Sequence, residues 1–280
     1  MTCIQHSFPN RKKMARHYGK IAVRALYDEV ALYPKPGLVS FIDNGAHDDM
    51  DGELFFRSLF GLRHYFFRVG LRAAQNAPLW ELVQLGQEAE RTMHHITGGI
   101  NTHRGAIFAL GIFCTTICKL STRYTRFSIH DLHVAIIEQW SCYLQKHHQN
   151  KNTHGELVRQ KYAVHDAKQM AIEGYKLVFD TYLVLLEVKQ DKEFFGLLAY
   201  QRFLLALDDI NVLYRTGPEG LYFARRHIQQ CITLAQREQS IQEAIKLHIL
   251  FSQKNISPGG VADMLGLIYF LHHVFSGRAG

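Results

Sequence analysis

The residues best suited to chemistry lie in one short stretch, Lys35–Asp51, which reads KPGLVSFIDNGAHDDMD. It combines a Pro-Gly break and a histidine with four carboxylates, at Asp43, Asp48, Asp49 and Asp51. Because the whole chain carries a net charge of +7, an acidic cluster here needs a cause. Neighbouring carboxylates are commonly neutralised by a cation or divided between acid and base roles. An acidic helix N-cap would explain the same cluster, so both interpretations stay open at this point.

Four other polar segments interrupt apolar sequence: TGGINTHRGAIF at 97–108, THG at 153–155, LLALDDINVLYRTGPEGL at 204–221 and SPGGVADMLGL at 257–267. Asp208 and Asp209 fall within an apolar helical run, so at least one carboxylate is expected to be poorly solvated. Such a group needs a partner or a raised pKa. The backbone amides of the Ser-Pro-Gly-Gly run at 257–260 could bind a phosphate group at the start of a helix. An ordinary helix N-terminus uses the same residue types, so both interpretations stay open.

Helices are expected to position these segments. The chain has 280 residues, 47% of them hydrophobic, and only six prolines, which favours one helical core over a sandwich or barrel. We predict an all-α single domain of about nine or ten helices over residues 13–280, after a flexible N-terminus at 1–12. The active-site pocket is expected where the polar helix junctions meet. Helical spacing predicts helices at about 14–33, 52–74, 78–95, 102–120, 129–146, 166–188, 192–214, 219–235, 241–251 and 261–275.

Charge and cysteine pattern exclude several classes of protein. The basic residues form no stripe interleaved with aromatics, so we expect no nucleic-acid partner. The five cysteines show no CxxC spacing, and no signal-peptide pattern opens the chain, which predicts reduced thiols in the cytoplasm. The most apolar window, Gly105–Cys118, is too short to span a bilayer and is expected to be a core helix, so no membrane association is predicted.

Taken in order, the polar segments resemble the triphosphoribosyl-dephospho-CoA synthase family, from about Ala25 to Phe275. The motifs that carry the resemblance are EVALYPKPGLVSFIDNGAHDDMD, TGGINTHRGAIFALG, THG, DDINVLYRTGPEGL and NISPGGVADML. The resemblance implies an all-helical enzyme that transfers the triphosphoribosyl group of ATP to the ribose 2′-hydroxyl of 3′-dephospho-CoA and releases adenine. It also implies Mg²⁺ on the triphosphate. The product is the prosthetic-group precursor for citrate lyase or malonate decarboxylase, with a holo-acyl-carrier-protein transferase as the possible downstream partner.

The resemblance suggests roles for individual residues. Cleavage of an N-glycosidic bond builds positive charge on the ribose, which a carboxylate can stabilise while an acid protonates the leaving base. The expected catalytic residues are Asp49, Asp51, Asp209, His47 and His103, with Asp49, Asp51 and Asp209 also expected to bind metal. The expected substrate- and phosphate-binding residues are Lys35, Gly37, Asn101, Thr102, Arg104, Asn211, Arg215, Ser257, Gly259, Gly260 and Asp263.

One segment departs from the family pattern. In AVHDAKQMAIEGYK, residues 163–176, Met170 stands where the family carries Glu and Lys168 where it carries Arg, while Glu173 lies nearby. This departure leaves two other hypotheses about the function open. One is a related nucleoside or phosphoribosyl transferase with another acceptor, and the other is a nucleotide-binding protein that has lost its chemistry.

Overall fold

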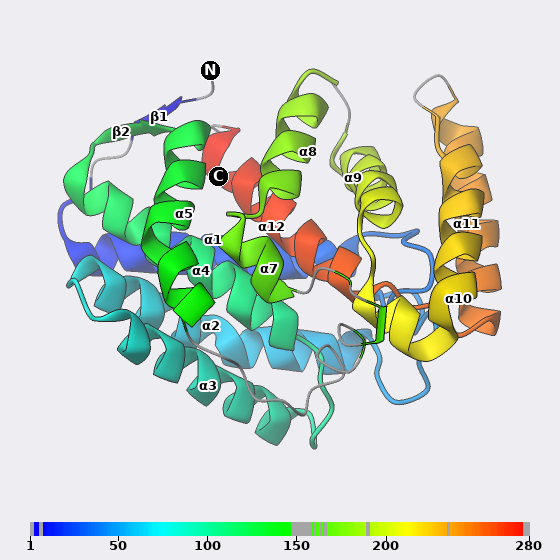
Figure 1. Ribbon diagram of the computed structural model, residues 1–280, viewed down its shortest axis with the longest axis horizontal. Coiled ribbons are helices and arrows are strands. Elements are labelled where there is room, and N and C mark those ends of the chain that lie inside the picture. The colour runs from blue at the N-terminus through cyan, green and yellow to red at the C-terminus, as the bar shows by residue number, and fades with distance from the viewer. Residues whose placement is uncertain are drawn as a thin grey trace.

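The computed structural model describes residues 3–5, 8–146, 158, 161–162, 164, 167–188, 191–233 and 236–276. Within these residues the chain forms eleven helices and two short strands (Figure 1). The all-α prediction is therefore confirmed. The elements are β1 (Cys3–Gln5), α1 (Arg11–Ala31), α2 (Gly52–Ala74), α3 (Leu79–Ile96), α4 (Arg104–Arg123), β2 (Arg126–Ser128), α5 (Ile129–Lys146), α7 (Ala167–Ile172), α8 (Lys176–Leu186), α9 (Lys192–Ala206), α10 (Ile210–Cys231), α11 (Arg237–Gln253) and α12 (Gly259–Phe275).

The two strands were not expected from the sequence. β1 pairs antiparallel with β2, with Cys3 opposite Ser128 and Gln5 opposite Arg126. Three residues are too few to show an alternating pattern, which explains why the pairing could not be predicted. The N-terminal segment that we expected to be flexible therefore contributes a strand, and α1 begins at Arg11, capped by the side chain of Asn10.

The core forms around α12 and α4. α12 packs against α1, α4, α8 and α9, and most of its residues are buried. α4 is apolar and long enough to cross a membrane by length and composition, but 72% of its most apolar window is buried inside the fold. A helix enclosed in this way is the core helix that the sequence predicted.

Two predicted helices are broken in the structure. The helix expected at 166–188 is interrupted after α7, where Gly174 and Tyr175 take left-handed φ values of 68° and 57°. The helix expected at 192–214 ends at Ala206, and α10 then runs through a kink at Gly217, just before Pro218. Apolar spacing continues across these breaks, so periodicity alone could not detect them.

The helix junctions lie close together in space. In Figure 1 the blue loop between α1 and α2, the start of α2, and the starts of α10 and α12 lie on the right-hand side of the molecule. Segments that are more than 200 residues apart in sequence therefore share one region, and their contacts define the candidate site.

Candidate functional site

The loop between α1 and α2 is held against the start of α12. Gly37 has a left-handed φ of 77°, and a Cβ there would lie 2.0 Å from the carbonyl oxygen of Ile256. The Tyr200 hydroxyl donates to the Pro36 carbonyl at 2.6 Å, and the Ala46 amide donates to the Gly37 carbonyl at 3.1 Å. Gly37, expected to bind substrate, thus allows a close backbone approach that only glycine permits.

Lys35 forms a buried ion pair. Its Nζ donates to Glu29 Oε1 at 2.5 Å and to the Glu29 carbonyl at 2.6 Å, and both side chains are almost fully buried. Burial lowers the pKa of Lys35 and raises the pKa of Glu29, while each charge offsets part of the other's shift. In this arrangement Lys35 faces a carboxylate, whereas the sequence predicted that it faces phosphate.

A buried histidine supports the same loop. His248, on α11, places Nε2 2.6 Å from Asp43 Oδ1 and Nδ1 3.1 Å from the Lys35 carbonyl. Both partners are acceptors, so the two hydrogen bonds are complete when both ring nitrogens carry a hydrogen. His248 could not be singled out from the sequence, because it lies inside α11 and outside the polar segments.

His47, Arg215 and Ser257 come together at the edge of the site. His47 Nε2 lies 2.8 Å from Ser257 Oγ and 3.3 Å from Arg215 Nη1, and Nδ1 lies 3.4 Å from Asp49 Oδ1. Burial and the neighbouring Arg215 charge lower the pKa of His47. Arg215 also donates to the Ala46 carbonyl and to the Asn255 side chain, so the three predicted residues are brought together by direct contacts.

Asp209 joins two helix N-termini. Its Oδ1 accepts the amides of Asn211 and Val212 at 2.9 and 3.1 Å, and Oδ2 accepts the amide of Val261 at 3.1 Å. The carboxylate is buried, and desolvation raises its pKa to about 6, although these amide hydrogen bonds oppose the shift. Asp209 is therefore the poorly solvated acid that the sequence predicted, and it caps α10 and α12 together.

Asp263 reaches the N-terminus of a third helix. A Cβ on Gly105 would lie 1.9 Å from Asp263 Oδ2, and the Ala106 amide donates to the carboxylate. Desolvation raises the pKa of Asp263 well above its ordinary value, with the charges of Glu29 and Asp209 adding to the shift. Asp263 and Asp209 are thus neighbouring carboxyl groups at the starts of α4, α10 and α12.

His103 links the start of α4 to α2. Its Nδ1 lies 2.8 Å from Ser58 Oγ, and the Thr102 hydroxyl donates to Ser58 at 2.7 Å. Burial lowers the pKa of His103 to about 3, with the charge of Lys35 as the second cause, so the ring is neutral. Its Nε2 is buried without a hydrogen-bond partner in the described part of the chain, which is uncommon for a polar group in a folded protein.

The other predicted residues have simpler surroundings. Asn101 caps the start of α4 by accepting the Arg104 amide at 3.1 Å, and the Arg104 guanidinium lies 3.5 Å from Glu90. Asn211 packs beside Gly259, and Gly260 lies beside the Asp209 carboxylate. The THG segment at 153–155 lies outside the described residues.

The three aspartates expected to bind metal do not form one group. Asp49 is exposed in the loop, Asp51 caps α2 by accepting the Leu54 amide at 2.7 Å, and Asp209 is occupied by backbone amides. In the parts of the chain that the structure describes, no three His, Cys, Asp or Glu side chains are arranged to hold a metal ion. A cation here would depend on oxygens supplied by the ligand.

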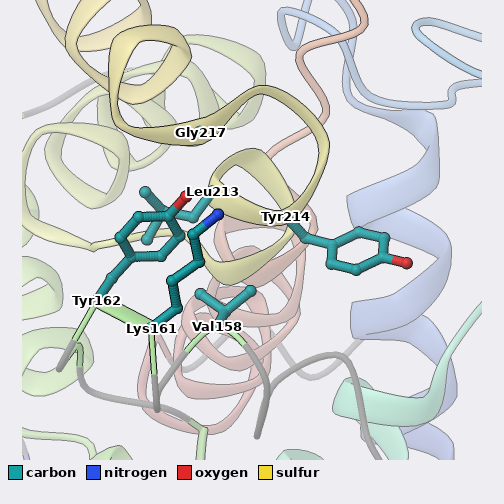
Figure 2. Close-up of a pocket in the computed structure, with 6 residues that line it drawn as sticks. All are labelled: Val158, Lys161, Tyr162, Leu213, Tyr214 and Gly217. Carbon is teal, nitrogen blue, oxygen red and sulfur yellow. The ribbon is translucent and has the colours of Figure 1, made fainter.

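Two pockets are lined by residues in α10 or shortly before it. One, of about 370 Å³, lies between residues 158, 161 and 162 and helix α10, with Tyr162, Lys161 and Leu213 on its wall (Figure 2). In that view the Tyr214 ring points away from the other labelled side chains. The second pocket, of about 340 Å³, lies between the turn after α7 and the end of α9. Its lining includes Met170, which stands where the family carries Glu, and also Glu173, the acidic residue that lies nearby in the sequence.

The arrangement can bind an anion and carry out acid–base chemistry. The starts of α2, α4, α10 and α12 are tied together by Ser58, Asp263 and Asp209, and helix N-termini favour negative ligands. The carboxyl groups with raised pKa values lie among these helix starts, where a proton donor and a charge-stabilising carboxylate are both available.

Known proteins match the chain over almost its full length. The family model CitG, described as ATP:dephospho-CoA triphosphoribosyl transferase, matches residues 15–279. A probable 2-(5''-triphosphoribosyl)-3'-dephosphocoenzyme-A synthase of Acinetobacter calcoaceticus is 32% identical over 273 residues, which is 95% of this chain and 94% of that relative. The protein of the same description from Azotobacter vinelandii is 34% identical over 278 residues, or 93% and 92% of the two chains.

A further relative carries an additional region. Protein CitXG of Haemophilus influenzae is 32% identical over 287 residues, which cover 95% of this chain but 62% of that relative. No solved structure matches the chain. The full-length matches, with four of the five polar segments gathered in one region, lead to one conclusion. The chain belongs to the triphosphoribosyl-dephospho-CoA synthase family CitG, whose members are transferases that use ATP.

Proposed function

We propose that the protein transfers the triphosphoribosyl group of ATP to the ribose 2′-hydroxyl of 3′-dephospho-CoA and releases adenine. The observation that carries the proposal is the full-length family match combined with the cluster of helix N-termini at the predicted polar segments. The triphosphate is kept in this reaction, so the enzyme must hold it without cleaving it. Backbone amides at helix starts suit that task.

Arg215 is the proposed main side-chain contact to the triphosphate. It is half-buried beside His47 and Ser257, and burial lowers its pKa, which shows that its charge is poorly solvated. A phosphate group would provide the charged partner that its present contacts, the Ala46 carbonyl and the Asn255 side chain, do not. Gly259 and Gly260 begin α12 beside Asp209, and their amides already donate to the Ser257 carbonyl at 3.0 Å and to the Asp209 carboxylate. We propose them as backbone contacts only for a triphosphate that replaces these acceptors.

Asp263 and Asp209 are the proposed acid–base residues. When the bond between the ribose C1′ and adenine N9 breaks, its electron pair leaves with adenine, which needs a proton. Burial raises the pKa of Asp263 well above its ordinary value, which favours the protonated form and makes Asp263 suited to supply that proton. The second carboxylate, Asp209, stabilises the positive ribose and accepts the proton of the attacking 2′-hydroxyl. The two carboxyl groups together therefore release one proton and take up one proton.

Mg²⁺ enters the proposal only with the nucleotide. When bound, it would neutralise triphosphate charge. Asp48 and Asp49 are exposed in the loop, and their charges raise the pKa of Arg215. We propose these two carboxylates as the protein ligands of Mg²⁺. Mg²⁺ commonly takes one or two carboxylates plus substrate phosphates, which fits a structure without a ready-made metal group among its described side chains.

Incubation of the purified protein with ATP, Mg²⁺ and 3′-dephospho-CoA tests the function. We expect equal amounts of free adenine and of a product heavier than dephospho-CoA by one triphosphoribosyl group, measured by liquid chromatography and mass spectrometry. Adenine release that requires another acceptor would identify a related transferase. Nucleotide binding without adenine release would identify a protein that has lost its chemistry.

The biological setting is also a proposal. We propose that the enzyme acts in the cytoplasm, where its five free cysteines stay reduced, and that it serves malonate decarboxylase or citrate lyase. The product would then pass to a holo-acyl-carrier-protein transferase. Deletion of the gene should leave the acyl carrier protein of one of these enzymes without its prosthetic group, and mass spectrometry of that carrier protein would show which.

A further inference from the structure

Helices α1 and α2 lie side by side and share an outer face that exposes large apolar side chains (Figure 1). These side chains are each between 40% and 68% exposed, and they are Tyr27, Phe41, Ile42, Phe56 and Phe60. The rings of Tyr27 and Phe41 are in contact, with centroids 5.4 Å apart, and a Cβ on Gly52 would lie 3.0 Å from Phe41 Cδ1. Phe56 follows Gly52 by about one helical turn. The surface is therefore continuous from α1 through the loop to α2, and we call it the α1–α2 face.

Four residues of α2 on this face follow the spacing of a helix-packing stripe. Glu53, Phe56, Phe60 and Arg63 are separated by three, four and three residues, which places them along one side of the helix. All four are exposed. Spacings that alternate between three and four are those by which one helix packs against another. Contiguous exposed apolar surface of this kind indicates an interaction site.

The two ends of the stripe carry opposite charges. Glu53 precedes the two phenylalanines and Arg63 follows them. α1 adds to the basic end, because the Arg16 guanidinium lies 6.0 Å from the ring of Phe67 on α2, and Lys20 is exposed one turn further along α1. Among the residues that the structure describes, Arg16, Lys20 and Arg63 form no ion pair, so their charges are available to a partner.

This arrangement of charge selects a second copy of the chain as the partner. In a two-fold dimer a surface meets an identical surface that runs in the opposite direction. Glu53 is as far from Phe56 as Arg63 is from Phe60, so the stripe is symmetrical about its centre in spacing and opposite in charge. With the axis at that centre, Phe56 meets Phe60 of the partner subunit and Glu53 meets Arg63 of the partner subunit. An anionic surface would instead be repelled at the acidic end, where Asp51 is also exposed.

We propose that the α1–α2 face binds a second copy of this chain in a two-fold dimer, with the phenylalanines at its centre and a Glu53–Arg63 ion pair on either side. The dimer also covers Phe41 and Ile42, which belong to the loop that His248 holds through Asp43. The inference does not depend on the proposed reaction, and its test needs no substrate.

Sedimentation velocity of the full chain at about 1 to 100 μM tests for the dimer, because association depends on concentration. We expect the wild type to approach twice the 32.3 kDa mass of one chain as the concentration rises. Phe60→Ser should raise the dimer dissociation constant at least about tenfold, because aromatic residues at the centre of an interface contribute most to binding. Tyr222→Ser on α10 is the matched control and should leave the constant unchanged, since Tyr222 is an aromatic residue 68% exposed outside the α1–α2 face.

Exchange of charges tests the two-fold arrangement itself. Arg63→Glu and Glu53→Lys should each raise the dissociation constant at least about tenfold, because like charges then face each other. The double variant reverses the ion pair and should return the constant to within about threefold of the wild type. Urea unfolding of each variant checks that it is folded.

A wild type that stays monomeric over this concentration range would overturn the inference. A dimer that Phe60→Ser leaves intact, or a double variant no tighter than its two parents, would overturn it as well.

Discussion

At the residue scale, Lys35 is the residue for which the structure and the sequence-based prediction differ most clearly. The structure pairs it with Glu29, whereas the sequence predicted a contact with phosphate. Loss of one partner leaves the other charge buried and alone, which costs about 3–5 kcal/mol. We expect Lys35→Met to lower the free energy of unfolding by that amount, and the double variant with Glu29→Gln to recover a large part of it. Urea unfolding of the two single variants and the double variant would measure the coupling.

The same experiment distinguishes the two roles of Lys35. If Lys35 holds phosphate, as the sequence predicted, Lys35→Met should keep wild-type stability and raise the KM for ATP. A double-mutant cycle without coupling would contradict the structural role of the pair.

Asp209 predicts a pH dependence of stability. Its pKa is about 6 in the folded state and 3.8 when unperturbed, so between these values the folded chain binds the proton that the unfolded chain has released. This contribution is fully present at low pH and is lost as pH rises through about 6, a change of about 3 kcal/mol. Asparagine does not titrate. We therefore expect the stability of the wild type relative to Asp209→Asn to fall between pH 4 and 7, as measured by urea unfolding at each pH.

The opposite trend would be a free energy of unfolding that rises with pH more in the wild type than in Asp209→Asn. It would show that Asp209 is ionised with a low pKa. In that case its amide hydrogen bonds would outweigh its burial. Groups far from Asp209 titrate equally in both proteins, whereas the titration of Asp263 also changes, because the charge of Asp209 contributes to its raised pKa. The comparison therefore isolates Asp209 together with its effect on Asp263.

At the element scale, the contact between α4 and α12 depends on Gly105. A Cβ at this position would lie 1.9 Å from Asp263 Oδ2, so Gly105→Ala must displace the carboxyl group. We expect turnover to fall at least about tenfold, because small displacements of catalytic groups are costly. Gly86→Ala in α3 is the control, since its Cβ would meet only the Tyr65 hydroxyl at 3.5 Å, and it should raise stability by about 0.5–1 kcal/mol.

Steady-state kinetics and urea unfolding of the two alanine variants would decide the point. Gly105→Ala with wild-type turnover would show that Asp263 does not need its place at the start of α4.

The helices were predictable where apolar spacing and breakers agree. α1, α2, α3 and α12 follow from periodic apolar residues bounded by Pro or Gly, and the structure confirms them. The break at Tyr175 could not be predicted, because a left-handed aromatic residue has no sequence signature. The end of α9 at Ala206 was missed because apolar residues continue to Leu207 and beyond.

The sequence was sufficient to predict which polar segments form the candidate site, but not which side chains within it contact one another. The polar segments at 97–108, 204–221 and 257–267 lie next to one another through Asp209 and Asp263, as expected for converging helix junctions. Glu29 and His248 were missed because each lies inside a helix, and only the tertiary fold brings them to Lys35 and Asp43. The sequence does not distinguish a buried lysine from an exposed one, so the pairing of Lys35 with Glu29 could not be inferred.

At the scale of the whole molecule, our central proposal is that the starts of α4, α10 and α12 form the reaction centre and that Asp263 acts within it as the acid. Asp191 provides a matched control, because it caps α9 by accepting the Phe194 amide at 3.0 Å and lies outside the cluster. Comparing Asp263→Asn with Asp191→Asn separates loss of a reacting group from loss of a helix cap.

The rate of adenine release from ATP in the presence of 3′-dephospho-CoA tests this claim most directly. We predict that Asp263→Asn lowers kcat at least about 100-fold while the protein stays folded, as expected when a general acid is removed. Asp191→Asn should keep kcat within about twofold and lose only about 1 kcal/mol of stability. A folded Asp263→Asn enzyme that releases adenine at the wild-type rate would contradict the account.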